Sequence, residues 1–191
     1  MRRSENGPDW DRVFEFASAQ DGYFSVAQAE AAGISRPNLQ AHLKRGHVLR
    51  VHRGVYRLVR YPPGEHEDLA AIWLRSDQEG VFSHQTVLAL YGLSDVLPAR
   101  VHITLPPSWR RRKLLEGLVV HFGEVPESER AWFGAVPITS VRRTLQDCAV
   151  AGLSPEHLQQ AAMQALERGL VARSDIPDVE RTLRPFGGLE P

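Results

Sequence analysis

Cysteine is nearly absent from this sequence. The 191 residues contain one, Cys148, so the chain can form neither an internal disulfide nor a multi-cysteine zinc site. Because Cys148 lies in the helical pattern RRTLQDCAVAG, we interpret it as a small buried apolar residue rather than a reactive thiol. Such cysteine usage fits a reducing compartment, and we expect a cytoplasmic protein.

Long apolar runs are also missing. No segment approaches the roughly 20 apolar residues that a bilayer span requires, and the N-terminal MRRSENGPDW has two arginines with no apolar stretch behind them. We therefore expect neither a membrane partner nor a secretory signal. A hydrophobic fraction of 42% is enough for one or two globular domains in a chain of 191 residues.

The motifs of common enzymes are missing as well. The sequence has no Gly-rich phosphate loop, no G-x-S-x-G turn and no paired carboxylates in a strand-rich setting. His84, His102 and His121 lie among apolar neighbours, but no pair has metalloprotease or zinc-site spacing, so we interpret them as structural. Arg143 and Asp147 are four residues apart and are expected to pair on one helix. We expect no enzyme, no metal and no cofactor.

Acidic residues are absent between Glu30 and Glu65, where the chain has seven Lys or Arg. The whole chain is neutral, with 23 basic and 23 acidic residues, yet residues 1–61 contain 10 basic and 6 acidic side chains. Residues 62–191 contain 13 basic and 17 acidic side chains. The net charges of +4 and −4 indicate a polyanionic partner for the first part of the chain only.

Around this basic segment the sequence predicts a winged helix-turn-helix. A stripe that includes Val13 and Phe14 marks the first helix, Gly33 forms the tight turn, and Ser35 caps the third helix. Two short strands around Arg53-Gly54 make a hairpin, and YPPG then forms a linker. The expected helices cover residues 9–20, 26–32 and 36–45, and the expected strands cover 48–51 and 55–58.

The rest of the chain alternates helical and strand patterns. The expected fold class is therefore α/β (α+β), with a winged helix-turn-helix domain over residues 1–61 and a mixed α/β domain over residues 65–191. In the second domain, helices are expected near residues 65–79, 83–91, 140–150, 154–168 and 174–185, and strands near 99–106, 116–125 and 135–140.

The third helix carries side chains that suit DNA recognition. A helix-turn-helix places its second helix in the major groove, and here Leu39 and Leu43 would face the core. On the opposite side, Arg, Asn and Gln can form two-pronged hydrogen bonds with purine edges, whereas Lys and the wing arginines suit phosphates. The candidate DNA-binding residues are Arg36, Pro37, Asn38, Gln40, Lys44, Arg45 and Arg53.

A second basic run, SWRRRK, lies in the predicted C-terminal domain. Two interpretations of Arg110, Arg111, Arg112 and Lys113 stay open: a solvated connection between strands, or a second contact with DNA phosphates. Each neutralised phosphate adds roughly 0.9 to the slope of log affinity against log salt concentration, so the two interpretations differ measurably.

The segment DGYFSVAQAEAAGISRPNLQAHLKRGHVLRVHRGVYRL resembles the N-terminal domain of the AbiEi-family antitoxins. The shared pattern is a Gly-Tyr/Phe-Phe opening, an Ala-Gly-Ile/Val-Ser turn and an Arg-Gly-Val-Tyr-Arg wing end. Farther along, SHQTVLALYGLSDVLPARVHITLP, PITSVRRTLQDCA and ALERGL resemble the C-terminal region of that family in order and spacing. The resemblance spans roughly residues 10–172.

This resemblance implies a bacterial repressor of a type IV toxin–antitoxin operon that binds double-stranded DNA at repeats upstream of its own gene. It also implies a nucleotidyltransferase-like toxin, countered through the C-terminal domain without a stable complex. The alternative is a protein-interaction module that neutralises its toxin by direct contact. Carried over by the resemblance, the DNA-reading positions are Ser35, Arg36, Pro37, Asn38, Gln40, Lys44 and Arg53.

Overall fold

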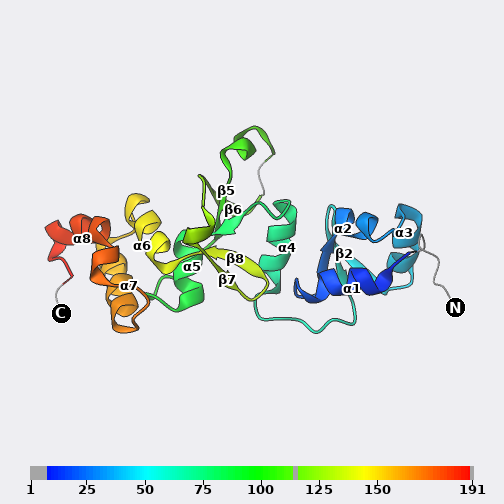
Figure 1. The fold of residues 1–191 in the computed structure, drawn as a ribbon, viewed down its shortest axis with the longest axis horizontal. Helices are drawn as coiled ribbons and strands as arrows, with labels where there is room; N and C mark the ends of the chain where they lie inside the picture. Colours follow the sequence, from blue (N-terminus) through cyan, green and yellow to red (C-terminus); the bar gives the residue numbers. More distant parts are fainter. Residues whose placement is uncertain (1–7, 114–115, 190–191) are drawn as a thin grey trace. The chain divides into compact units, whose positions relative to one another are not determined.

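The structure, a computed structural model, describes residues 8–113 and 116–189 (Figure 1). The chain divides into two compact units, Met1–Gln78 and Glu79–Pro191, and each is described by itself. Both units combine helices with a sheet, which confirms the predicted α+β class. Among the described residues, no helix is both long enough and apolar enough to cross a membrane.

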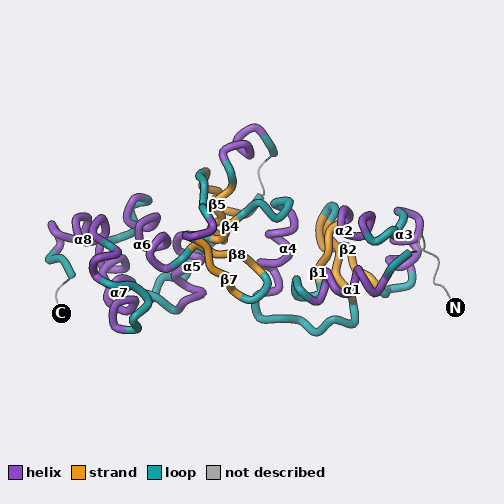
Figure 2. Tube along the Cα trace, in the orientation of Figure 1, coloured by secondary structure: helices purple, strands orange, loops and turns teal. Residues whose placement is uncertain are grey.

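The N-terminal unit has the order of elements of a winged helix-turn-helix followed by one more helix (Figure 2). Its three strands form an antiparallel sheet in the order β1-β3-β2, and β2 and β3 make the wing. The elements are α1 (Trp10–Ser18), β1 (Tyr23–Ser25), α2 (Val26–Ala31), α3 (Arg36–Lys44), β2 (Val48–His52), β3 (Val55–Leu58) and α4 (Glu67–Arg75).

Local capping fixes the helix-turn-helix. Ser25 Oγ accepts a hydrogen bond from the Gln28 amide at 3.1 Å, and Gln28 Oε1 accepts one from the Ser25 amide at 2.8 Å, which forms a capping box. Gly33 has a φ of +72° in the turn between α2 and α3, a left-handed conformation that glycine adopts without strain. The next helix starts at once, because Ser35 Oγ accepts from the Asn38 amide at 3.4 Å.

The core of this unit lies between α1, the sheet and the two helices of the helix-turn-helix. The apolar face predicted for the first helix is right for Val13, which is fully buried, and wrong for Phe14, which is 57% exposed. Phe14 follows Val13 directly and so points about 100° away from it around the helix. The buried core residues are Val13, Ala17, Phe24, Ala29, Ala32, Ile34, Leu39, Val48 and Tyr56.

Helix α4 packs against β1, β2 and β3, so the N-terminal unit ends after Gln78 rather than in the YPPG segment. Arg57 of the wing forms an ion pair with Glu67 of α4, with Nη2 and Oε2 3.0 Å apart. Beyond the helix, Gln78 Nε2 donates a hydrogen bond to Gln20 Oε1 at 3.0 Å. These polar contacts hold the segment that the sequence prediction assigned to the second domain.

The C-terminal unit is built on a five-stranded mixed sheet in the order β6-β5-β4-β8-β7. Two of its strands, β4 and β7, were not predicted. β4 has only two residues, and β7 pairs with β8 in an antiparallel hairpin. The elements are β4 (Val81–Phe82), α5 (His84–Tyr91), β5 (Val101–Leu105), β6 (Leu118–Phe122), β7 (Arg130–Phe133), β8 (Val136–Thr139), α6 (Val141–Val150), α7 (Pro155–Glu167) and α8 (Pro177–Leu183).

The last three helices form their own core with α5. Leu88, Leu145 and Leu158 are fully buried in it, and Cys148 is 1% exposed beside them. Burial, with the charge of Asp147 as a smaller contribution, raises the pKa of the Cys148 thiol to about 12. The structure therefore confirms Cys148 as a buried apolar residue.

Candidate nucleic-acid interface

Helix α3 has one buried face and one exposed polar face. Leu39 is 2% exposed, and Leu43 packs against the same core, as the sequence predicts. Asn38 is half-buried. The remaining candidates of this helix and its flanks are exposed: Ser35, Arg36, Pro37, Gln40, Lys44 and Arg45.

Arg36 has an acidic partner that sequence reasoning missed. Its Nε lies 3.3 Å from Glu30 Oε1, and the two side chains are 82% and 49% exposed. An ion pair this open to solvent contributes only about 0–1 kcal/mol. A phosphate or a base edge can therefore replace Glu30 as the partner of Arg36 at little cost.

The wing is short and is fixed at its tip. Arg53 and Gly54 form the turn, with a Gly54 φ of +79°. The Gly54 carbonyl accepts a hydrogen bond from the Val26 amide at 2.8 Å. Because this bond ties the turn to the start of α2, the wing holds the exposed Arg50 and Arg53 in a defined position beside the helix-turn-helix.

Arg57 differs from the other arginines of the wing. Its side chain is 13% exposed and pairs with Glu67, and its Nη2 donates to the Tyr61 carbonyl at 3.0 Å. These contacts turn Arg57 towards α4 and leave it less exposed than Arg50 and Arg53.

His42 is a packing residue on the far turn of α3. Its ring stacks on Trp10, with centroids 4.0 Å apart, and meets His47 edge-on at 5.4 Å. Burial first, and then the nearby His47 and Arg45, lower the pKa of His42. His42 therefore adds no positive charge to the exposed face at neutral pH.

The second basic run lies at the end of the 3₁₀ turn Pro107–Arg111, and its last two members have carboxylate partners. Arg112 Nη1 lies 3.7 Å from Glu79 Oε1, and Lys113 Nζ lies 3.7 Å from Glu116 Oε1. These acidic neighbours offset part of the positive charge that the sequence places there.

The arginines of this run also contact aromatic rings. The Arg110 guanidinium lies 5.1 Å from the Phe122 ring centroid, and the Arg112 guanidinium lies 4.5 Å from that of the buried Trp109. Such stacking leaves the edge of a guanidinium able to bind a phosphate. All four side chains, Arg111 included, are exposed.

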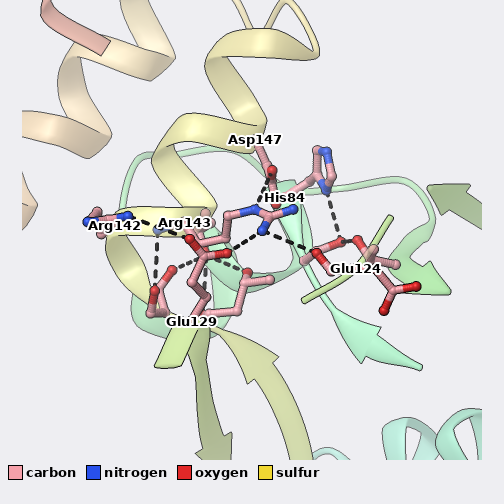
Figure 3. A network of polar contacts seen from close by, with 11 residues as sticks. His84, Glu124, Glu129, Arg142, Arg143 and Asp147 are labelled. Atoms are coloured by element: carbon pink, nitrogen blue, oxygen red, sulfur yellow. Dashed lines mark hydrogen bonds and ion pairs between the residues drawn. The ribbon is translucent and has the colours of Figure 1, made fainter. Parts of the chain in front are cut away.

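The C-terminal unit contains an ion-pair network centred on Arg143 (Figure 3). Arg143 Nε donates to Asp147 Oδ1 at 2.8 Å, which confirms the predicted pair, and its Nη1 forms an ion pair with Glu129. Arg142 reaches the same Glu129 at 3.5 Å. Burial raises the pKa of Asp147 against the opposing effect of Arg143. The network joins α6 to the residues before β7.

Three histidines that the sequence leaves scattered meet in this unit. His84, His102 and His121 come from α5, β5 and β6, and each offers a ring nitrogen within 4.8 Å of the others. Burial first, and then the neighbouring histidines, lower the pKa of His84 to about 3 and that of His102 to about 4. Burial also lowers the pKa of His121. All three rings are therefore neutral at pH 7.

Sequence reasoning treated these histidines as separate because it considered spacing along one helix. The signal that could have found them lies in the strands: β5 and β6 pair in parallel, with His102 opposite Val119 and Thr104 opposite His121. Since side chains alternate along a strand, this register puts His102 and His121 on the same face of the sheet.

The comparisons with known proteins agree with the N-terminal fold. Residues 11–59 match the family model described as "Transcriptional regulator, AbiEi antitoxin". The match covers the helix-turn-helix and the wing, so the N-terminal domain is similar to that of the AbiEi antitoxins and transcriptional regulators. The predicted family resemblance is confirmed over these residues.

The other comparisons concern the whole chain. No curated protein matches it. Among solved structures, it is similar to the crystal structure of the RV2827C protein from Mycobacterium tuberculosis, at 18% sequence identity, over 97% of this chain and 82% of that one, with a TM-score of 0.46.

Proposed function

We propose that this protein is a cytoplasmic, sequence-specific repressor that binds double-stranded DNA upstream of its own type IV toxin–antitoxin operon and also serves as the antitoxin. The observation that carries the proposal is the exposed basic face of α3 and the wing, in a segment with no acidic residue between Glu30 and Glu65. The family of the N-terminal domain supports it.

In this proposal, α3 enters the major groove with its N-terminal half against the bases. Arg36 and Gln40 are exposed there, and each can form two hydrogen bonds with one purine edge, Arg with guanine and Gln with adenine. Asn38 is half-buried, so it reaches the groove less freely. Arg36 exchanges Glu30 for the base as it binds.

Phosphate contacts then position the helix. Lys44 and Arg45 at the end of α3 and Arg53 at the tip of the wing are exposed and suit phosphates on the two sides of the groove. The capped N-terminus at Ser35 adds a favourable dipole for an anion. We further propose that Arg110–Lys113 contact phosphates elsewhere on the operator.

The arrangement of the operator follows from groove geometry. If two copies bind inverted repeats, their half-site centres lie about 34 Å, or one helical turn, apart or a multiple of that distance. In the antitoxin role, the C-terminal unit counters a nucleotidyltransferase-like toxin without a stable complex.

The double variant Arg36→Ala/Gln40→Ala tests the recognition surface. Each lost two-pronged contact costs about 1–3 kcal/mol of discrimination, so specific binding falls at least tenfold. The matched control is Arg12→Ala, which removes an exposed arginine of α1 in the same unit. Fluorescence anisotropy on the upstream DNA reports binding, and circular dichroism confirms the fold. Unchanged operator binding by the folded double variant would contradict the assignment.

The second candidate function is a protein-docking winged helix that binds the toxin directly. Two apolar side chains of β2 favour it, since Leu49 is 51% and Val51 is 38% exposed. The two functions predict opposite results when the protein is mixed with its toxin. A stable complex on size exclusion, together with equal binding to operator and scrambled DNA, would select the docking function.

A further inference from the structure

The histidine cluster of the C-terminal unit has no part in the proposed DNA binding. His102 and Thr104 of β5 lie on the same sheet face as His121 of β6, and His84 opens α5 next to them. His84 is 8% exposed, and the other two are half-buried. Three imidazoles gathered at one place without an acidic partner for each are unusual in a protein interior, where polar groups need partners.

The nitrogen atoms of the cluster have spacing close to that of metal ligands. His102 Nδ1 and His121 Nε2 are 3.1 Å apart. Two imidazole nitrogens on a tetrahedral zinc ion, each at 2.0–2.1 Å from it, are separated by about 3.3 Å. The His84 ring stacks on His121, with centroids 3.5 Å apart, and its ligand nitrogen lies within 4.8 Å of those of the other two rings.

The ring of His84 has a hydrogen-bonding neighbour outside the cluster. His84 Nδ1 lies 2.9 Å from Ser83 Oγ, which in turn accepts a hydrogen bond from Thr104 Oγ1 at 2.8 Å. The Ser83 contact occupies Nδ1 and leaves Nε2 of His84 available. Outer hydrogen bonds that fix the ring of a ligating histidine are a general property of protein metal sites.

The backbone at His84 is strained. Its φ is +54°, a left-handed conformation that is unfavourable for a residue with a side chain. Such strain persists where the surrounding structure requires a side chain in one place. Here it brings His84 onto His121, and the neutral state of the rings is the one that binds a metal.

A buried carboxylate oxygen supplies a second, independent observation. Asp147 Oδ2 is buried and, within the described residues, accepts no hydrogen bond. The charge of Asp147 acts on His121. A cation among the three rings would give this oxygen a positive neighbour and offset the cost of its burial.

We propose that the C-terminal unit binds one divalent transition-metal ion of the zinc class through His84, His102 and His121. Asp147 balances the charge of the ion, and the fourth coordination position is left for water or an added ligand. None of these four residues is among the proposed DNA contacts, so this proposal does not depend on operator binding.

Titration of the chelator-treated full chain with Zn²⁺ and Co²⁺ tests the site. We expect one ion per chain, a rise in melting temperature with metal, and the visible absorption bands of four-coordinate Co²⁺. His102→Asn and His121→Asn should each lower affinity at least tenfold. His157→Asn is the matched control, because His157 lies in the same unit, hydrogen-bonded to Ser154 and outside the cluster, and it should bind like the wild type.

The wild type alone can overturn the proposal. Absence of saturable binding of either ion, or binding that the two cluster variants leave unchanged, would show that the histidines are structural. If the variants do not fold, imidazole nitrogen NMR of the wild type decides. Zn²⁺ that shifts the resonances of three histidines supports the site, and Zn²⁺ that shifts none, or only those of exposed histidines, rejects it.

Discussion

The two units of this protein place their polar groups differently. The N-terminal unit has an apolar core and, apart from the shielded pair Arg57–Glu67, presents the basic residues of α3 and the wing on exposed faces. The C-terminal unit brings polar groups inward, as a cluster of three histidines and a network centred on Arg143. The difference fits the two kinds of binding that we propose, one by an exposed surface and one by groups inside the fold.

Two ion pairs show the same contrast, although Arg57–Glu67 of the N-terminal unit is shielded as well. Arg36 and Glu30 are 82% and 49% exposed, whereas Arg143 and Asp147 are 21% and 16% exposed. A solvated pair breaks at little cost, so Arg36 can turn to DNA. Breaking the shielded pair would leave a charge poorly solvated, so Arg143 serves to hold α6 in place.

The largest expected effect comes from substitutions that destabilise the core of one unit and leave the core of the other intact. Leu39→Ala and Leu158→Ala each remove a side chain that is at most 2% exposed, and each should cost about 2–5 kcal/mol of unfolding free energy. Because the cores are separate, Leu39→Ala should weaken operator binding in mild urea while Cys148 stays protected from thiol reagents. In Leu158→Ala, Cys148 should become reactive towards thiol reagents before operator binding weakens. If both probes respond equally in both variants, the units unfold as one and the comparison fails.

Acid should weaken the C-terminal unit of the metal-free protein. The folded-state pKa values of His84 and His102 are lowered, to about 3 and about 4. The stability that their neutral forms provide is therefore complete above the unfolded pKa of about 6.5 and is lost as the pH falls below it. Between pH 6.5 and 5.5 the loss should be on the order of 2 kcal/mol for the pair.

Urea titrations with a chelator present, followed by Cys148 reactivity, measure this loss. The matched variant is His102→Asn, which removes one of the titrating groups and should make the pH dependence shallower. Stability that is constant from pH 7 to 5.5 would show that the histidines titrate normally and would weaken the contrast between the units.

A smaller effect should distinguish the residues that contact phosphates from those that contact bases. Lys44→Ala/Arg53→Ala should lower the salt slope of operator binding by about 1.8, because each lost phosphate contact removes roughly 0.9. The ratio of operator to scrambled affinity should stay nearly the same, since phosphates carry no sequence information. A lower ratio with an unchanged slope would reverse the assigned roles.

The smallest expected effect concerns the second basic run. Arg111→Ala should reduce the salt slope by about 0.9 if this exposed side chain contacts a phosphate. Glu167→Ala provides a matched control of opposite charge on the surface of the same unit. An unchanged slope in Arg111→Ala would identify residues 110–113 as a solvated connection between strands.

Local signals in the sequence predicted most of the fold. Ser25 and Ser35 cap their helices, and Gly92 ends α5 with a φ of +60°, all as expected from residue type. These signals act over a few residues, so they can be recognised in a single sequence without the tertiary structure. The two-residue β4 could not be found in this way, because its place depends on pairing with the distant β5 and β8.

The candidate site was predicted where it depends on one helix and missed where it depends on tertiary contacts. The exposed face of α3 follows from the spacing of Leu39 and Leu43. The burial of Arg57 against Glu67 depends on α4 packing on the wing. The histidine cluster likewise requires the register of two parallel strands, which no periodicity within one segment encodes.

The most direct test of the central claim is the binding of the full chain to its own upstream DNA and to scrambled DNA of the same length, at two salt concentrations. The account predicts binding to the upstream DNA that is at least tenfold tighter and that weakens steeply with salt. Equal, weak binding to both DNAs at both salt concentrations would contradict a repressor and leave the docking function.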